Sequence, residues 1–163
     1  MTSETERDWV ATLIAVQEGR PPVPLLDDHG IRALLRAKPR IAVIGASNRP
    51  VRPVHGVMRT LISAGYDVVP VRPGTDEVLG LRCYPTLAEA VRATGPVDVV
   101  DVFRRPEHCP AHAREAVEAG ARCLWLQQGI ASAEAGRIAH EAGLAVVMDR
   151  CTAVEHWRLA ADA

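Results

Sequence analysis

The chain of 163 residues is short of aromatic side chains, of net charge and of long apolar runs. Aromatic residues make up only 4 % of it, so we expect the three tryptophans, Trp9, Trp125 and Trp157, to pack inside the fold. The 19 Lys and Arg residues nearly balance the 20 Asp and Glu residues, which offers no global attraction to nucleic acid or to a membrane. No apolar stretch approaches the ~18 residues of a membrane span. We therefore expect neither a nucleic-acid nor a membrane partner.

Cysteine is also scarce, since Cys83, Cys109, Cys123 and Cys151 are widely spaced and form no CxxC pair. A disulfide framework is therefore not expected. The first ten residues, MTSETERDWV, are polar and acidic and do not resemble an export signal. These features together predict a protein of the reducing cytoplasm.

Short apolar runs alternate with helical patterns from residue 40 onward. Strands are predicted at 41–45, 66–71, 81–84, 97–103, 123–127 and 144–148, and helices at 54–65, 86–95, 106–120, 132–143 and 153–160. Strands that are apolar on both faces and are separated by helices are typical of a parallel sheet covered on two sides. The sequence therefore predicts an α/β, Rossmann-like doubly wound, mainly parallel sheet with helices on both faces.

Residues 1–26 are expected to form a helical extension with a proline-rich connector, followed by the domain proper at 27–163. In the extension, Val10, Leu13 and Ile14 are predicted to share one helical face. A short helix is predicted at 27–37, at the entry to the domain.

Helix ends carry their own signals in the domain. Thr86 is a predicted N-cap. Four predicted helices end in a glycine, namely Gly65, Gly95, Gly120 and Gly143.

Arginines gather after the predicted strands, where ligands of doubly wound sheets bind. The six arginines at these strand ends are Arg49, Arg52, Arg72, Arg104, Arg105 and Arg150. Guanidinium groups pair with phosphates through two parallel hydrogen bonds, so this clustering in a nearly neutral chain predicts a small polyanionic ligand.

The first strand end departs from the dinucleotide fingerprint GxGxxG, because Gly45 is followed by Ser47 and Pro50 where glycines would stand. Without those glycines a close grip on the pyrophosphate of NAD is disfavoured. A phosphate could instead meet the Ser47 hydroxyl and the free N–H groups at the start of the next helix. Arg72, at the end of the second strand, favours a ligand with a phosphate on its ribose, which leaves both NADP and coenzyme A (CoA) open.

Six stretches in order resemble the stand-alone CoA-binding protein family, whose domain is similar to the CoA-binding domain of the succinyl-CoA synthetase α subunit. They are VIGASNRPVRP, GYDVVPVRPG, VDVVDVFRRPE, LWLQQGI, EAGLAVVMDRC and VEHWRL. The resemblance covers roughly residues 27–160. It implies that CoA, or an acyl-CoA, lies across the strand ends of a Rossmann-like domain.

The resemblance also implies the positions of the ligand contacts. Phosphates would meet Gly45, Ala46, Ser47 and Arg49, the adenine and ribose would meet Val71, Arg72 and Pro73, the middle of the ligand would meet Phe103 and Arg104, and the pantetheine arm would meet Gln127, Gly129, Arg150 and Cys151. Two positions depart from the family pattern. Gly74 stands where a basic residue is frequent, and Gln128 stands where an apolar residue is usual.

No catalytic or metal-binding residue is predicted. Ligase chemistry in the synthetase needs a further domain with a phosphorylatable histidine, and only residues 151–163 follow Arg150. His108, Cys109 and His112 have metal-like spacing, and His108 and His112 fit one helix face, but no third or fourth ligand is evident. Asp101 is expected to hydrogen-bond a neighbouring loop.

Cys151 has two interpretations, a structural cysteine or a thiol that forms a mixed disulfide with CoA. The sequence thus predicts a carrier, sensor or delivery protein for CoA that is non-catalytic on its own. An NADP-dependent oxidoreductase or redox sensor is the alternative, and a third reading is a vestigial pocket in a protein that acts through a partner. A homodimer or a protein partner is left open.

Overall fold

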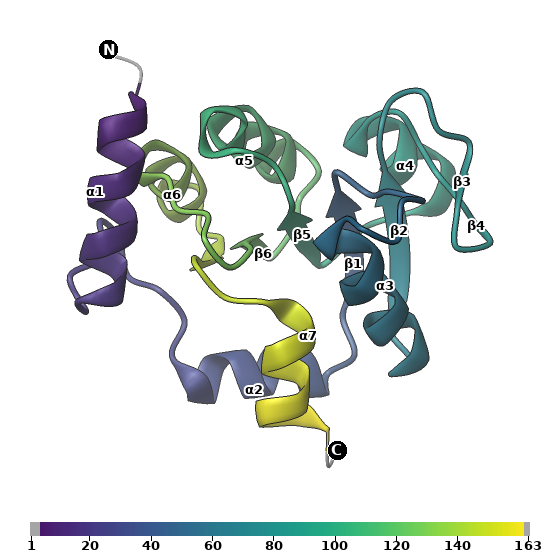
Figure 1. Cartoon of the computed structure of the whole chain (residues 1–163), viewed down its shortest axis with the longest axis horizontal. Helices are drawn as coiled ribbons and strands as arrows, with labels where there is room; N and C mark the ends of the chain where they lie inside the picture. The colour runs from purple at the N-terminus through teal and green to yellow at the C-terminus, as the bar shows by residue number, and fades with distance from the viewer. Residues whose placement is uncertain (1–3, 162–163) are drawn as a thin grey trace.

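A five-stranded parallel sheet forms the centre of the computed structural model, which describes residues 4–161. Its strands are β1 (Arg40–Ile44), β2 (Asp67–Val71), β5 (Val99–Val102), β6 (Cys123–Leu126) and β7 (Ala145–Val147). They lie in the order β2-β1-β5-β6-β7, with parallel pairing throughout. This arrangement, of which Figure 1 labels β1, β2, β5 and β6, confirms the predicted Rossmann-like fold.

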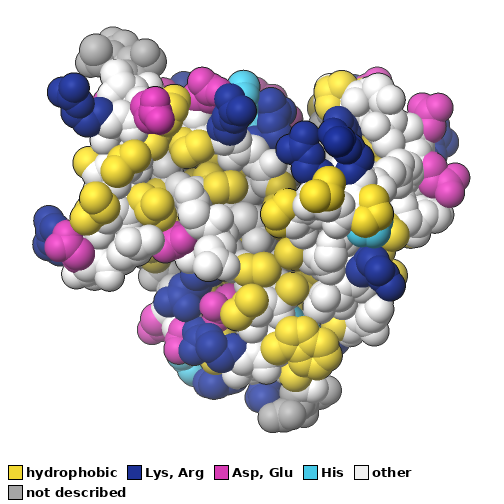
Figure 2. All heavy atoms as spheres, in the orientation of Figure 1, with side chains coloured by type: hydrophobic (Ala, Val, Ile, Leu, Met, Phe, Trp, Pro, Cys, Tyr) yellow, Lys and Arg dark blue, Asp and Glu magenta, His cyan; other side chains and the backbone are white. Residues whose placement is uncertain are grey.

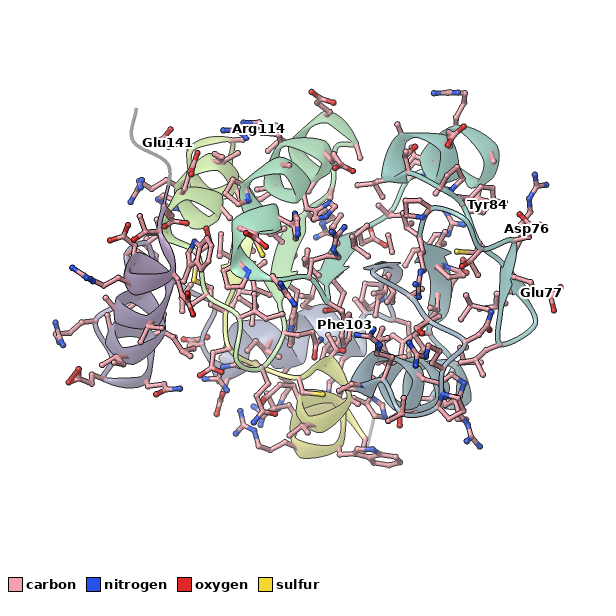
Figure 3. All side chains as sticks on the ribbon, turned by 45° about the horizontal axis from the view of Figure 1, so that its top comes forward. Asp76, Glu77, Tyr84, Phe103, Arg114 and Glu141 are labelled. Atoms are coloured by element: carbon pink, nitrogen blue, oxygen red, sulfur yellow. The ribbon has the colours of Figure 1, made fainter. Side chains whose placement is uncertain are left out.

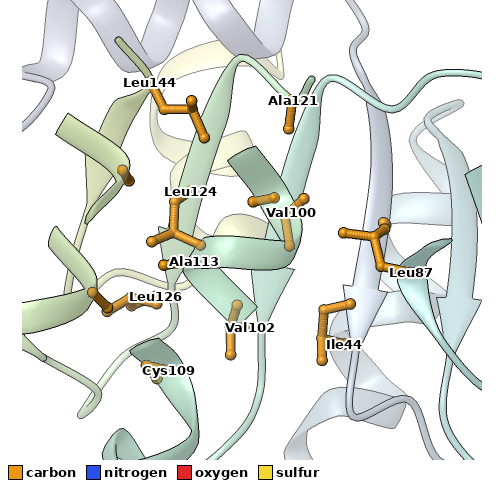
Figure 4. Packing of buried hydrophobic residues seen from close by; sticks show 14 of the residues in the cluster. Ile44, Leu87, Val100, Val102, Cys109, Ala113, Ala121, Leu124, Leu126 and Leu144 are labelled. Atoms are coloured by element: carbon orange, nitrogen blue, oxygen red, sulfur yellow. The ribbon is translucent and has the colours of Figure 1, made fainter. Parts of the chain in front are cut away.

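Helices cover both faces of the sheet. One layer holds α4 (Leu87–Thr94), α5 (Cys109–Glu118) and α6 (Ala133–Glu141), and the other holds α2 (Asp28–Arg36), α3 (Pro53–Ser63) and α7 (Thr152–Glu155) with a following π-helical turn (His156–Ala160). Side chains alternate along β1, so that Ala42 and Ile44 pack toward the first layer and Ile41 and Val43 toward the second. Figure 4 shows the first of these two cores.

The weak strand predicted at 81–84 lies outside the main sheet. Its first two residues form β4 (Leu81–Arg82), which pairs antiparallel with β3 (Glu77–Val78). Leu79 and Gly80 make the turn between them with φ of 51° and 78°. A single bridge between Val71 and Tyr84 joins this hairpin to β2. Arg82 is exposed, so the segment is not buried on both faces as the strands of the main sheet are.

Helix boundaries agree closely with the sequence signals. Thr86 Oγ1 accepts a hydrogen bond from Glu89 N–H at 3.2 Å, as an N-cap should. All four predicted glycine stops follow the ends of their helices and have positive φ. The segment predicted as one helix at 106–120 instead starts with a 3₁₀ turn (Pro106–His108) before α5 begins.

The N-terminal helix α1 (Glu6–Gln17) lies along the edge of the molecule beside α6 (Figure 1). The predicted apolar face of α1 is partly wrong, because Val10 and Ile14 are 53 % and 50 % exposed. At 100° per residue these two side chains lie on a different stripe from Leu13 and Val16, which pack on the core. The helix meets the domain along a narrow edge, so only one stripe is covered.

Two of the tryptophans differ in environment. Trp125 is fully buried, as predicted, and its indole N–H donates to Arg150 O at 2.7 Å. The packing role predicted for Trp157 is wrong, because the side chain is 66 % exposed on the π-helical turn. Within residues 4–161, no helix is long and apolar enough to cross a membrane.

Candidate functional site

A groove of about 1180 Å³ opens at the carboxyl ends of the strands. The chain passes from β1 to β2 on one side and reaches β5 on the other, so the strand order reverses between β1 and β5. Phe103, which directly follows β5, lies near the middle of the molecule in Figure 3. Figure 2 shows Lys and Arg side chains gathered around the hollow on this face.

Most of the predicted contact residues line this one groove. They are Gly45, Ser47, Arg52, Val71, Arg72, Pro73, Phe103, Arg104, Arg105, Gln127 and Cys151. Four others lie elsewhere. Ala46 is fully buried in the second core, Arg49 is exposed, Gly129 donates its N–H to Asp149 Oδ1 at 2.7 Å, and Arg150 lies 3.5 Å from both Asp28 and Glu155.

The turn after β1 is held in place by its backbone. Gly45 has φ +88°, and a Cβ there would lie 2.7 Å from Phe103 O, so a side chain would separate this turn from the β5 end. Gly45 N–H also donates to Val71 O at 3.0 Å, which links the turn to the end of β2. Ser47 is only 2 % exposed, and its Oγ accepts from Arg49 N–H at 3.1 Å. The turn therefore brings three strand ends together.

Cationic side chains without acidic partners line the groove. Arg72 donates from Nη1 to Ala46 O at 3.3 Å, across the β1 turn. Within residues 4–161, Arg52, Arg104 and Arg105 form no salt bridge, although five other arginine side chains of the fold do so with nearby carboxylates. Unpaired guanidinium groups around a concave surface attract phosphate groups.

A buried hydrogen-bond network supports the β6 end of the groove. Gln127 Nε2 donates to Asp101 Oδ1 at 2.7 Å and to Thr152 Oγ1 at 3.0 Å, while Thr152 Oγ1 donates to Asp101 Oδ2 at 2.9 Å. Burial raises the pKa of Asp101 to about 7, and the two hydrogen bonds oppose this shift. Asp101 thus bonds to a neighbouring loop through Gln127, as predicted, and also to Thr152 at the start of α7. Both amide hydrogens of Gln127 are used in the network, so its Oε1 is the atom left for a ligand.

His112 and Glu115 of α5 also line the groove, and sequence reasoning missed this role for both. His112 Nδ1 lies 3.1 Å from Glu115 Oε1, without the geometry of a hydrogen bond. Burial, together with the charges of Arg104 and His108, lowers the pKa of His112 to about 4, and burial raises the pKa of Glu115. The imidazole is therefore neutral near pH 7. The sequence signal available for this role was the i, i+3 spacing of His112 and Glu115 on the helix that follows β5.

The other candidate constellations do not assemble. Cys109 is buried, which raises the pKa of its thiol to about 12. Among the described residues, no group of three or more His, Cys, Asp and Glu side chains could hold a metal ion. His156 is buried and is hydrogen-bonded through Nδ1 to Tyr66 Oη at 2.8 Å, and it does not line the groove that Cys151 lines. Cys151 is half-buried at the far end of the groove.

The model of a CoA binding domain family matches residues 39–157. The chain belongs to this CoA-binding family. Membership supports binding of CoA, and the match starts after α1 and the connector.

Two relatives of this CoA-binding chain match it over nearly the whole of their own length. An uncharacterised protein of Bacillus subtilis, YneT, is 42 % identical over 126 residues, which are 77 % of this chain and 91 % of the relative. A hypothetical protein of Pyrococcus horikoshii has a TM-score of 0.77 with 40 % identity, covering 82 % of this chain and 92 % of that one.

A larger enzyme contains a similar domain. The apo acetyl-coenzyme A synthetase 1 of Ca. Korarchaeum cryptofilum has a TM-score of 0.57 with 28 % identity. The match covers 66 % of this chain but only 25 % of the enzyme. The CoA-binding chain therefore corresponds to one part of that synthetase.

Proposed function

We propose that the chain binds CoA or an acyl-CoA in the groove at the strand ends and is non-catalytic on its own, as a carrier, sensor or delivery protein. The observation that carries this proposal is the set of three groove arginines, Arg52, Arg104 and Arg105, without salt-bridge partners among residues 4–161. Membership in the CoA-binding family supports the identity of the anion.

The residues present fit CoA in size and in chemistry. Small-molecule pockets commonly measure ~300 to 1000 Å³, so a groove of about 1180 Å³ suits a nucleotide with a long arm. In the proposed pose the phosphates lie near Ser47 and Arg52, beside the start of α3, where backbone N–H groups lack helical partners. The phosphate on the ribose lies near Arg72.

The pantetheine arm would then extend past Phe103 toward the β6 and β7 ends. Gln127 Oε1, the acceptor left over from the buried network, would receive an amide N–H of the arm. The thiol end would reach the neighbourhood of Cys151, which lines the far end of the groove. Asp101 makes its hydrogen bonds inside the protein and does not face the groove as a free base.

Isothermal titration calorimetry with CoA, dephospho-CoA, NADP and NAD tests this proposal. We expect CoA to bind more tightly than dephospho-CoA by about 10- to 100-fold, the range of one hydrogen bond to a charged group at ~1.5 to 3 kcal/mol. Equal Kd values for the two would remove the role of Arg72. Binding of NADP with no binding of CoA would refute the proposal in favour of an NADP-dependent oxidoreductase or redox sensor.

A further inference from the structure

A second pocket, of about 620 Å³, lies between α3 and the π-helical turn that follows α7. α3 and α7 pack against each other (Figure 1), and the main lining residues are Gly56, Arg59, Thr60 and Ser63 of α3 with His156 and Trp157 of the turn. No described residue lines both this pocket and the groove at the strand ends. The stretch VEHWRL (154–159), one of the six that resemble the CoA-binding family, does not line the groove, so the proposed CoA pose leaves it unexplained.

Positive charge without negative charge lines the second pocket. Lys38, which precedes β1, and Arg59 form no salt bridge within residues 4–161, and no Asp or Glu of that range lines the pocket. Lys38 Nζ donates to Ala64 O at 2.7 Å and lies 4.4 Å from the centre of the Tyr66 ring. These contacts hold the ammonium at the pocket with N–H bonds to spare, so the pocket is suited to an anionic group.

His156 offers the pocket a buried hydrogen-bond donor. The residue is only 5 % exposed, and its Nδ1 lies 2.8 Å from Tyr66 Oη. Burial raises the pKa of Tyr66 to about 12, and the hydroxyl has no other partner within residues 4–161, so it donates to Nδ1. Burial and the charge of Lys38 lower the pKa of His156, which keeps the imidazole neutral near pH 7. The proton of the neutral ring is therefore on Nε2, which has no partner among the described residues.

Trp157 offers a flat apolar surface beside this donor. The residue is 66 % exposed, and its ring lies edge-on to His156, with 5.2 Å between the ring centres. Large aromatic rings stack favourably on other flat rings, including nucleic-acid bases. π-helical turns are rare and occur frequently at functional sites. The turn therefore presents an unused stacking surface at the pocket.

Gly56 keeps the α3 side of the pocket open. A glycine inside a helix lowers the stability of that helix relative to alanine, and a Cβ at this position would meet no atom within 4 Å. Close packing therefore does not explain the glycine. A large side chain there would instead narrow the space beside Arg59 and Trp157.

We propose that this pocket binds a mononucleotide, with the base stacked on Trp157 and the phosphate held by Arg59 and Lys38. A phosphate monoester carries about two negative charges near pH 7, which the two cations match. His156 Nε2–H would donate to a phosphate oxygen, and the α3 hydroxyls would meet the ribose. The volume of about 620 Å³ falls within the ~300 to 1000 Å³ of small-molecule sites. This inference goes beyond the proposed function and does not rest on it.

An NMR titration with AMP, adenosine and inorganic phosphate tests the inference. The indole N–H signal of Trp157 is identified by its absence from the spectrum of Trp157→Phe, and it reports on this pocket because neither Trp9 nor Trp125 lines it. We expect AMP to shift this signal to saturation and to bind about tenfold more tightly than adenosine, the lower limit for one hydrogen bond to a charged group. Phosphate alone should bind about fivefold or more weakly than AMP, the minimum effect of stacking one base.

Three variants separate the parts of the ligand. Arg59→Gln should weaken the binding of AMP about tenfold and leave the Kd of adenosine unchanged. Trp157→Ala should weaken AMP and adenosine alike, by about fivefold or more, as measured by calorimetry. Gly56→Leu, which fills space without removing a charge, should also weaken both. All three should leave CoA binding unchanged, since none of these residues lines the groove.

Arg137→Gln is the matched control, because Arg137 is exposed on α6 in the opposite helical layer and lines neither space. AMP should bind this variant as tightly as the wild type. An AMP titration that leaves the Trp157 indole signal in place, or equal Kd values for AMP and adenosine, would overturn the inference. Loss of AMP binding in Arg104→Ala but not in Trp157→Ala would assign the nucleotide to the groove and overturn it as well. Absence of CoA binding with AMP binding intact would refute only the proposed function.

Discussion

The free energy of unfolding should contain a term that falls as the pH rises from 5 to 8, because Asp101 holds its proton in the folded protein. The unfolded chain releases this proton near pH ~3.9, whereas burial raises the pKa to about 7 in the folded state. Between these values the folded state binds more protons, so a rising pH favours unfolding. Below pH ~4 both states are protonated and the term vanishes.

The magnitude follows from the two pKa values. From pH 5 to pH 8 the Asp101 term should cost about 2 to 3 kcal/mol, given ~1.36 kcal/mol for each unit of difference. In Asp101→Asn the side chain keeps its shape and loses its charge, so this term disappears. His112 acts in the opposite direction between pH 4 and 6.5, since its pKa is lowered to about 4, and therefore the difference between variant and wild type is the quantity to measure.

Urea unfolding of the ligand-free protein at pH 5, 6, 7 and 8 gives this difference. The stability of Asp101→Asn relative to the wild type should rise by about 2 to 3 kcal/mol across that range. A parallel NMR titration of the Asp101 carboxyl carbon should show a midpoint near pH 7. A difference that stays constant from pH 5 to pH 8, with a carboxyl midpoint near ~4, would refute the reasoning about the buried network.

Three further substitutions test the site and its supports. Gly45→Ala should lower the free energy of unfolding by about 1 to 3 kcal/mol from backbone strain alone, with an added cost from the carbonyl 2.7 Å away, as measured by urea unfolding. Arg104→Ala should raise the Kd for CoA about tenfold or more and flatten its dependence on salt, whereas Arg49, exposed and outside the groove, should contribute less. Arg137→Ala, on the exposed side of α6, is the control and should leave the Kd unchanged. Thr86→Ala should cost about 1 kcal/mol of stability through loss of the α4 N-cap, with a change below ~0.3 kcal/mol contradicting the capping role.

Features that depend on local sequence could be predicted for this chain. The strands carry short buried runs, and the helices carry caps such as Thr86, so both signals lie within a few residues of the element they define. The position of the groove followed from the same information, because the carboxyl ends of parallel strands meet at one edge. The sequence did not specify the strand order itself, and this order decides which strand ends lie side by side at the groove.

Features that depend on distant contacts could not be predicted. Arg150 follows β7 and was predicted to contact the ligand, yet it lies 3.5 Å from Asp28. Asp28 precedes the first strand of the sheet in the sequence, so no local pattern links the two residues. The sequence likewise did not show which face of α1 would be exposed. Val10 and Leu13 are both apolar, and they differ only in that Leu13 packs on the core whereas Val10 faces solvent. Such outcomes depend on how the outer segments dock, and a helical pattern alone does not say which part of its surface is covered.

The single glycine of the first turn is explained by the neighbours of each position. Gly45 must lack a side chain because Phe103 O lies where a Cβ would stand, so this glycine serves the packing of two strand ends. Ser47 occupies the second glycine position and is buried, with its Oγ accepting from Arg49 N–H, so the loop is held by its own hydroxyl and turns outward. Pro53 then begins α3 as its first residue, where a missing N–H costs no helical bond. The second and third glycines of a dinucleotide-binding turn are thus replaced by residues that hold this loop in another way, and Arg52, at the end of the loop, lines the groove together with Arg104.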